Sequence, residues 1–275
     1  MIINSKGTSI IIAIFIIVVM AFMGVMFVSL INTSTFSSVN NLQSMQALYV
    51  AEGGIEYGKA ALAPYSSWYN FPNDPFSLAT NQALGNGSFT TTINVPATTA
   101  NKSFGKGANV IRVFSVDLFP PGGGSIGIGG SGDIRTYTNT ATGGALGNRF
   151  EGVSNPGPSA YAAGTYIYPV LTLAAPGITA TDTTIPFAGN SSKFLQKGTI
   201  TIADPPTNDE EIACAGIQTI PTPAFIGCDR GGTGVAHAAG LNILPVLTRQ
   251  EVLIQGDGVV GNARRVIADV TDQPL

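Results

Sequence analysis

The chain has 275 residues, of which 44% are hydrophobic and only 11% are charged, and its formal net charge is −3. With 13 Lys and Arg against 16 Asp and Glu, the chain has no basic surplus to neutralise phosphates, so we predict no nucleic-acid partner. The 2 Cys and the single His are too few for a Cys/His metal site or a His-based catalytic centre, so we predict no enzymatic activity, cofactor or metal.

Residues 10–31, IIIAIFIIVVMAFMGVMFVSLI, contain neither a charge nor a proline. As a helix they are about 33 Å long, enough to cross a hydrocarbon core of about 30 Å. Lys6 is the only charge before them, which favours a cytoplasmic N-terminus. The run is long for a cleaved secretory signal and no A-x-A site closes it. A simple single-pass anchor remains an alternative.

The helical pattern continues beyond the apolar run, and no proline occurs before Pro64. Apolar side chains recur there at spacings of three and four: Phe36, Val39, Leu42, Met45, Leu48 and Tyr49. We predict one helix over about residues 9–63, on the order of 80 Å long, loosened near its end by Gly53 and Gly54. Its second half is expected to pack along a globular domain.

A short leader, MIINSKG, precedes the apolar helix, and QALYVAEGGIEYGKAAL follows it. These first 63 residues resemble type IV pilin-like proteins, and most of all the minor pilins of filament tips and of mannose-sensitive haemagglutinin-type pili. The resemblance implies a leader over 1–7, which a prepilin peptidase removes between Gly7 and Thr8 before methylation of the new N-terminus. It also implies a stem helix over 8–63 that spans the inner membrane at 10–31 and then packs against other pilin subunits.

The fifth residue after the implied cleavage is Ile12, whereas most major pilins carry Glu there. In that family the Glu is thought to pair with the N-terminal amine of a neighbouring subunit. A buried carboxylate without a partner costs several kcal/mol, and a subunit at the filament end has no neighbour above it. Ile12 therefore favours a tip or initiating subunit over a repeating shaft subunit, and simple divergence is the alternative.

From Tyr65 onward, short β runs alternate with Gly, Pro, Asn and Asp, which predicts an antiparallel β region and an α+β fold. The stretch 120–132, PPGGGSIGIGGSG, is predicted to be a flexible loop. The predicted strands are 88–95, 109–118, 133–140, 166–173, 183–187, 198–203, 210–213, 224–228, 242–247, 251–255 and 263–270.

The C-terminal residues 248–275 are predicted to form a hairpin, with Gly256-Asp257-Gly258 and Gly261-Asn262 as turn material. This hairpin resembles the one that closes the sheet of pilin-like heads, with 88–95 as an early strand. Residues 64–170 are accordingly assigned to a pilin-like β head with the Gly-rich loop. Residues 171–247 resemble β modules of phage structural and surface proteins, which implies an inserted, architectural or adhesive module.

Two cysteines, Cys214 and Cys228, flank a predicted hairpin, and in an exported protein this spacing predicts one disulfide, with two buried thiols as the alternative. His237 has no acid or nucleophile beside it in the sequence and is predicted to be structural. The motif G-x-G-x-x-G at 127–132 lacks the helix that a dinucleotide site needs, so we assign it to a linker.

Two sets of charged residues remain. Glu52, Glu56 and Lys59 are predicted to be a solvated helix face with an ordinary ion pair. A loop over 204–211 is acidic, and a Ca²⁺ site there is a minor alternative because its ligand spacing matches no known loop. That loop is also where an exported hydrolase would place its chemistry.

Together these features predict a minor pilin-like structural subunit that acts in filament initiation or tip assembly, with possible surface adhesion through a ligand that the sequence does not identify. It would reside in the inner membrane before assembly and in an extracellular pilus or a periplasmic pseudopilus afterwards. The alternatives are a pseudopilin of a type II secretion system and a membrane-anchored adhesin that never polymerises.

Overall fold

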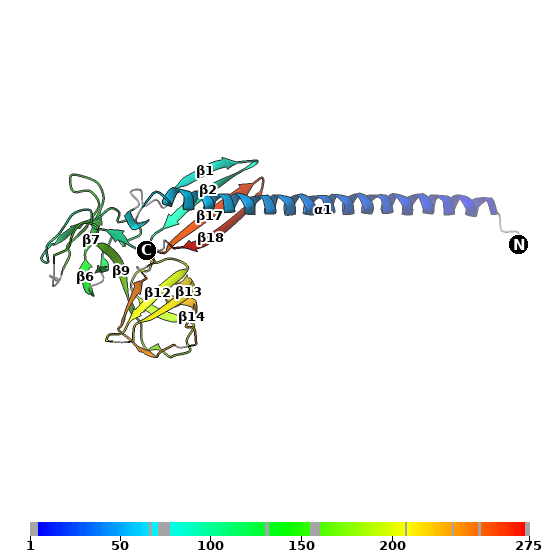
Figure 1. Cartoon of the computed structure of the whole chain (residues 1–275). Coiled ribbons are helices and arrows are strands. Elements are labelled where there is room, and N and C mark those ends of the chain that lie inside the picture. Colours follow the sequence, from blue (N-terminus) through cyan, green and yellow to red (C-terminus); the bar gives the residue numbers. More distant parts are fainter. Residues whose placement is uncertain are drawn as a thin grey trace.

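The computed structural model describes residues 5–65, 68–70, 78–129, 132–154, 160–206, 208–232, 234–246 and 249–272. It has an α+β fold in which one long helix, α1 (Ser5–Leu62), projects from a β-rich body (Figure 1). The 58 residues of α1 make it about 87 Å long, which confirms a single continuous helix. In the described part of the chain, α1 is the one helix long and apolar enough to cross a membrane.

The C-terminal part of α1 lies across a four-stranded antiparallel sheet, which we call the head sheet (Figure 1). Its strand order is β1 (Ala79–Leu84), β2 (Gly87–Asn94), β17 (Val252–Val260) and β18 (Ala263–Thr271). The two central strands come from opposite ends of the β region, with Ile93 opposite Ile254. The head sheet therefore needs both the start and the end of the β region.

Small residues let the helix and the head sheet approach closely. A methyl group added at Gly256 would lie 2.1 Å from the carbonyl oxygen of Ala51, and one added at Gly258 would lie 2.2 Å from that of Ala47. The predicted turn at Gly256-Asp257-Gly258 is wrong, because β17 runs straight through these residues. Its turn to β18 lies at residues 261–262.

Gly53 and Gly54 do not end or loosen the helix, which continues to Leu62. They serve the same close approach: Thr91 on β2 donates a hydrogen bond of 2.8 Å from its hydroxyl to the carbonyl oxygen of Gly54. The loss of helix propensity at these glycines is offset by packing against the sheet.

Six antiparallel strands form a closed barrel below the head sheet in Figure 1. The barrel closes because the first strand pairs with both the second and the last, as Leu171↔Ile243 and Leu173↔Phe187 show. Its interior holds a core that includes Ile202, Ile212 and Phe225. In pairing order the strands are β9 (Tyr166–Leu173), β16 (Asn242–Pro245), β12 (Gly198–Ala203), β13 (Glu210–Gln218), β14 (Ala224–Asp229) and β11 (Ile185–Ala188). A short ladder of β10 (Gly177–Ile178) and β15 (His237–Ala238) lies outside this circuit.

The remaining strands form a middle unit with its own core, which contains Ile111, Ile126 and Phe150. In its first sheet, β9 pairs with β3 (Thr98–Thr99) and with β5 (Gly124–Ile128), and β5 pairs with β6 (Asp133–Tyr137). Its second sheet has the strand order β4 (Val110–Arg112), β8 (Arg149–Glu151) and β7 (Asn139–Ala141). The pairing of β9 passes from the middle unit to the barrel between Val170 and Leu171. The predicted head over 64–170 is thus divided between the head sheet and the middle unit.

The Gly-rich stretch 120–132 is not a flexible loop throughout, because β5 lies within it. Ile126 and Ile128 are fully buried, and their burial fixes this strand in the sheet. A side chain at Gly127 would lie 2.2 Å from the ring of Tyr168, so this glycine makes room for the tyrosine. The strand β6 and not a helix follows the motif, as expected for a chain without a dinucleotide site.

Several predicted strands differ from the observed ones in length. The strand predicted over 109–118 is reduced to β4, and the one over 133–140 is divided into β6 and β7. β1 and β8 were not predicted: β1 is polar and mostly exposed, and β8 has only three residues. Beyond α1, the described residues contain one further helical turn, η1 (Trp68–Asn70).

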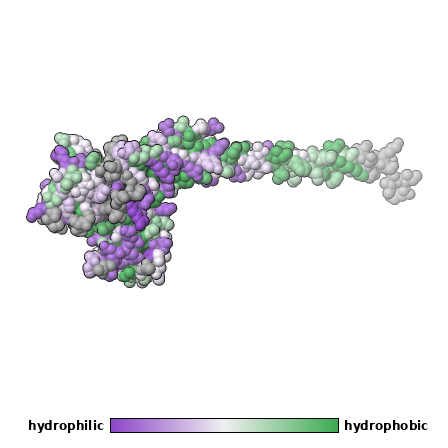
Figure 2. Space-filling model, in the orientation of Figure 1, coloured by the Kyte–Doolittle hydropathy of each residue, from purple (hydrophilic) through white to green (hydrophobic). Residues whose placement is uncertain are grey.

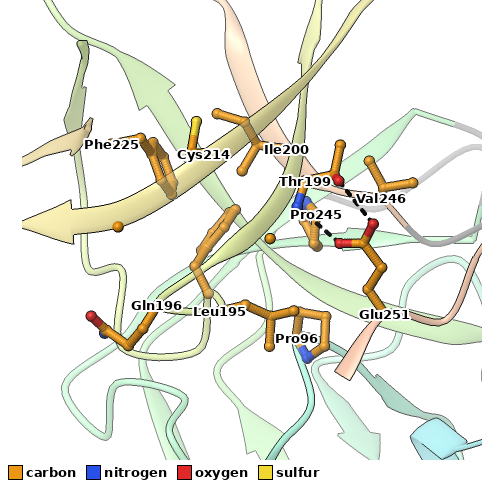
Figure 3. Close-up of a pocket in the computed structure, with 13 residues that line it drawn as sticks. Pro96, Leu195, Gln196, Thr199, Ile200, Cys214, Phe225, Pro245, Val246 and Glu251 are labelled. Atoms are coloured by element: carbon orange, nitrogen blue, oxygen red, sulfur yellow. Dashed lines mark hydrogen bonds between the residues drawn. The ribbon is translucent and has the colours of Figure 1, made fainter. Parts of the chain in front are cut away.

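A buried carboxylate joins the barrel to the head sheet. Glu251, which directly precedes β17, accepts hydrogen bonds from the backbone nitrogen (2.9 Å) and the hydroxyl (2.8 Å) of Thr199 on β12 (Figure 3). The adjacent Gln250 is also buried and accepts a hydrogen bond of 2.9 Å from the backbone nitrogen of Trp68. Beside Glu251 lies a cavity of about 10 Å³, about the room for one water molecule.

Replacing Thr199 by Val should lower the free energy of unfolding by about 1–3 kcal/mol, because the buried carboxylate of Glu251 loses its hydroxyl donor. Denaturant unfolding of the full chain in detergent measures this difference. Thr201→Val, two residues along the same strand, is the matched control and should change stability by less than about 0.5 kcal/mol. Equal effects of the two substitutions on the free energy of unfolding would show that the hydroxyl of Thr199 does not stabilise the buried carboxylate of Glu251.

Candidate functional site

The projecting part of α1 exposes an apolar surface around its whole circumference. Figure 2 shows hydrophobic side chains along this projection and hydrophilic ones gathered over the β-rich body. Large apolar side chains are exposed at almost every position of the predicted membrane segment: Ile12, Ile14, Phe15, Ile16, Ile17, Val18, Met20, Phe22, Met23, Val25, Met26, Phe27, Val28, Leu30 and Ile31. This surface is suited to lipid or to other apolar helices.

The uncharged part of the helix is much longer than a bilayer requires. No Asp, Glu, Lys, Arg or His occurs from Gly7 to Ala51, a distance of about 68 Å along a helix. About 20 residues are enough to span the hydrocarbon core. More than half of the uncharged segment therefore lies outside any single membrane crossing.

Beyond the membrane segment, several large apolar side chains of α1 lie exposed on the side away from the head sheet. Phe36, Leu42, Met45 and Tyr49 are 71%, 58%, 57% and 62% exposed. We call these four residues the outer stripe. The second half of α1 packs along the head sheet, as predicted, but these four side chains do not take part. The opposite side of the helix forms the contact, because Ala47 and Ala51 allow a close approach and Ile55 and Leu62 are buried in the core.

The outer stripe leads into an apolar hollow where the helix meets the head sheet. The hollow has a volume of about 210 Å³ and is lined by Tyr49, Val50, Leu84 and Val260, with Gln46 and the β1–β2 turn at its edge. Leu84 is itself 43% exposed. The hollow and the stripe form one continuous surface that the described residues of this chain leave uncovered.

Two threonines in the first turn after the membrane segment hydrogen-bond to the backbone of their own helix. The hydroxyls of Thr33 and Thr35 each donate a hydrogen bond of 2.9 Å to a carbonyl one turn earlier, those of Ser29 and Ile31. These hydroxyls can leave water without losing their partners, so this part of α1 tolerates close packing against another helix.

The residues implied for processing lie at the start of α1. Gly7 and Thr8 fall in its first two turns, and their side chains are outside the described ones. Ile12 is 55% exposed, and its methyl groups continue the apolar surface of the stem. No carboxylate occurs on the helix before Glu52.

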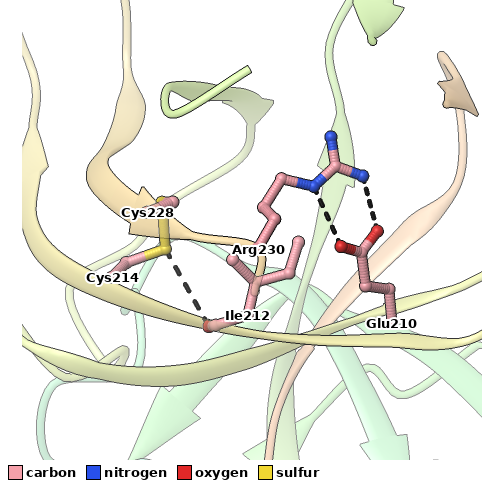
Figure 4. Close-up of a disulfide and its surroundings, with 5 residues drawn as sticks. All are labelled: Glu210, Ile212, Cys214, Cys228 and Arg230. Atoms are coloured by element: carbon pink, nitrogen blue, oxygen red, sulfur yellow. Dashed lines mark hydrogen bonds and ion pairs between the residues drawn. A yellow bond between two sulfur atoms is a disulfide. The ribbon is translucent and has the colours of Figure 1, made fainter. Parts of the chain in front are cut away.

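Cys214 on β13 and Cys228 on β14 form the predicted disulfide, which confirms that prediction (Figure 4). The two residues face each other in the antiparallel register, and both are buried in the barrel. The bond closes a loop across a sequence separation of 14 residues.

Replacing both cysteines by Ala should lower the stability of the barrel by about 3 kcal/mol, because the open loop has more conformational freedom in the unfolded chain. Thermal unfolding with and without reductant measures the effect. Reductant should lower the unfolding midpoint of the wild-type chain and leave that of the double variant unchanged. A wild-type unfolding midpoint that does not change with reductant would contradict the disulfide.

The acidic loop after β12 places its carboxylates on protein partners. Asp209 accepts a hydrogen bond of 2.8 Å from the backbone nitrogen of Asp204, and Oε2 of Glu211 lies 3.9 Å from Nη2 of Arg249. Among the residues that the structure describes, no group of three or more His, Cys, Asp or Glu side chains is arranged to hold a metal ion. The geometry gives no support to the Ca²⁺ alternative.

The other predicted polar residues occupy simple positions. Nζ of Lys59 lies 3.0 Å from Oε1 of Glu56 and 3.1 Å from Oδ2 of Asp269 on β18. Hydrogen bonds to these two carboxylates raise the pKa of Lys59. Glu52 is exposed. His237 differs from the sequence-based picture because two distant carboxylates, those of Asp204 and Glu210, contact its ring.

Comparison with known proteins adds no assignment to these observations: no protein-family model, no curated protein and no solved structure matches the chain.

Proposed function

We propose that the chain is a minor pilin-like structural subunit of a type IV pilus that acts in filament initiation or tip assembly. The observation that carries this proposal is the length of the uncharged, exposed surface of α1. A membrane anchor needs only the first part of it, whereas the outer stripe and the adjoining hollow need a protein neighbour.

Burial of the outer stripe supplies a driving force for assembly. Each large apolar side chain contributes about 1.5–3 kcal/mol when it moves from water into an apolar contact. Phe36, Leu42, Met45 and Tyr49 follow the proposed membrane segment in the chain, and they are exposed in the isolated subunit. A stripe that packs against a different surface of the next subunit makes a head-to-tail contact, and such contacts extend into a fibre when their rotation does not close a ring.

The start of the helix favours a terminal position in the fibre. In this proposal the chain is cut between Gly7 and Thr8, and Ile12 occupies the position where repeating subunits carry Glu. An apolar side chain there costs nothing when no neighbouring amine lies above it. The barrel, which lies apart from α1 in Figure 1, is the part of the subunit available for surface contacts such as adhesion.

Mass spectrometry of the native chain in sheared filaments tests the proposal. The expected chain begins at Thr8 with a methylated amine, occurs in the filament fraction, and keeps Met1 in cells without the prepilin peptidase. A chain with an intact Met1 that stays in the membrane while filaments form without it would instead favour the non-polymerising anchor. A pseudopilin would give the same N-terminus in a periplasmic fraction and no surface filament.

A further inference from the structure

A partly buried polar cluster joins several segments at one end of the barrel. Its members are Asp204 directly after β12, Glu210 at the start of β13, Arg230 directly after β14 and His237 on β15. His237 is 3% exposed, and its side chain is fully buried. Figure 4 shows the two-point contact between Arg230 and Glu210.

The imidazole of His237 lies between two carboxylates. Its Nδ1 is 3.0 Å from Oδ2 of Asp204, and its Nε2 is 2.9 Å from Oε2 of Glu210. An ionised carboxylate can only accept hydrogen bonds, so both ring nitrogens must donate. With both carboxylates ionised, only the imidazolium form, which has a hydrogen on each nitrogen, can donate in both contacts.

Arg230 completes the cluster. It donates from Nε to Glu210 (2.9 Å) and makes a second contact with the same carboxylate through Nη2. It also donates to the carbonyl oxygens of Thr179 and Val235, which belong to the segments around β10 and β15. With an imidazolium, the cluster holds two positive and two negative charges and is neutral.

The surrounding charges leave this balance intact. Burial alone would raise the pKa of Glu210, but hydrogen bonds from Arg230 and His237 hold it below the ordinary 4.5. Asp182 accepts a hydrogen bond from the backbone nitrogen of Thr179, and this bond lowers the pKa of Asp182. Asp209 binds the backbone nitrogen of Asp204. The pKa values of Glu210 and Asp182 are thereby held below their ordinary values.

We infer that this cluster is a pH-sensitive latch that fastens the β10–β15 ladder to the barrel only while His237 is protonated. Loss of the proton leaves a net negative charge in a buried site and sets a nitrogen lone pair against a carboxylate. The ladder has only two register pairs of its own, Gly177↔Ala238 and Ile178↔His237, and besides the cluster it is held by Ile178 in the barrel core.

The sign of the pH dependence follows from proton binding. The latched state holds a proton that an unlatched, solvated histidine releases above about pH 6.5, so latching weakens as the pH rises. On the acid side, the contribution of Glu210 is present above its ordinary pKa of 4.5 and is lost as the pH falls through its lowered value. The latch is therefore firmest in mildly acidic solution.

Nitrogen NMR of the ring tests the charge directly, because His237 is the only histidine in the chain. The sample is the full chain labelled with ¹⁵N-histidine, in detergent micelles. We expect both ring nitrogens to carry hydrogen at pH 7.5, where a solvated histidine is about nine-tenths neutral. A single protonated nitrogen at that pH would overturn the inference.

Hydrogen exchange tests the latch itself. After correction for the intrinsic pH dependence, protection of residues 177–182 and 235–240 should fall by about tenfold or more between pH 6 and pH 8.5. Asp204→Asn, whose amide can donate to a neutral ring, should remove this dependence. Protection that does not change with pH in the wild-type chain, or that changes equally in the variant, would refute the latch. If the variant does not fold, the wild-type exchange and the NMR result decide.

Discussion

Replacing Gly256 or Gly258 by Ala is expected to separate α1 from the head sheet, with a loss of about 3 kcal/mol in the free energy of unfolding. Overpacking a core costs about 1–3 kcal/mol, and these sites fall at the upper end. The new methyl group would meet the backbone oxygen of Ala51 or Ala47 at 2.1 or 2.2 Å. A backbone atom in a helix cannot move away without displacing the helix itself.

Denaturant unfolding of the full chain in detergent measures this loss, and limited proteolysis near the head sheet provides a second readout. Gly105→Ala is the matched control, because Gly105 is exposed and an added methyl group there meets no atom within 4 Å. If the Gly256 and Gly258 variants were as stable as this control, the close contact between α1 and β17 would not contribute to folding.

Replacing Leu42 by Glu should leave membrane insertion and folding unchanged but reduce incorporation into filaments by about a hundredfold. Leu42 is 58% exposed in the isolated chain, so a carboxylate there is solvated until a neighbour covers it. Covering an unpaired charge costs about 3 kcal/mol or more, which corresponds to the expected factor. Quantitative immunoblots of sheared filaments and membranes measure the ratio.

Thr142→Glu is the control for an added negative charge, because Thr142 is exposed in a loop of the middle unit, far from the outer stripe in the chain. This variant should enter filaments at the wild-type level. Normal incorporation of the Leu42 variant would contradict the proposal that the outer stripe is an assembly surface. A loss of the Leu42 variant from the membrane fraction would point instead to a folding defect, and the proteolysis pattern would reveal it.

The features that the sequence predicts correctly are local ones. The absence of charge and proline over the first part of the chain is enough to predict α1, and period-two alternation is enough for strands such as β2 and β12. The pairing of Cys214 with Cys228 also follows from the sequence, because the two residues flank one hairpin.

The features that the sequence does not predict depend on residues far apart in the chain. Gly127 and Gly256 look like loop and turn residues, yet each lies in a strand, because a tyrosine ring or a helix covers that position. His237 has no acid nearby in the sequence, and the barrel brings Asp204 and Glu210 to its ring. Local patterns carry no information about such contacts.

The division of the head sheet between β2 and β17 has a consequence for biosynthesis. During synthesis, α1 and the first two strands emerge well before their sheet partners, because the middle unit and the barrel are made in between. The docking side of α1 around Ala47 and Ala51 thus stays uncovered until β17 and β18 have been synthesised. A ribosome that stalls within the barrel would release a chain whose head sheet lacks two of its four strands, and such a product is a natural target for proteases.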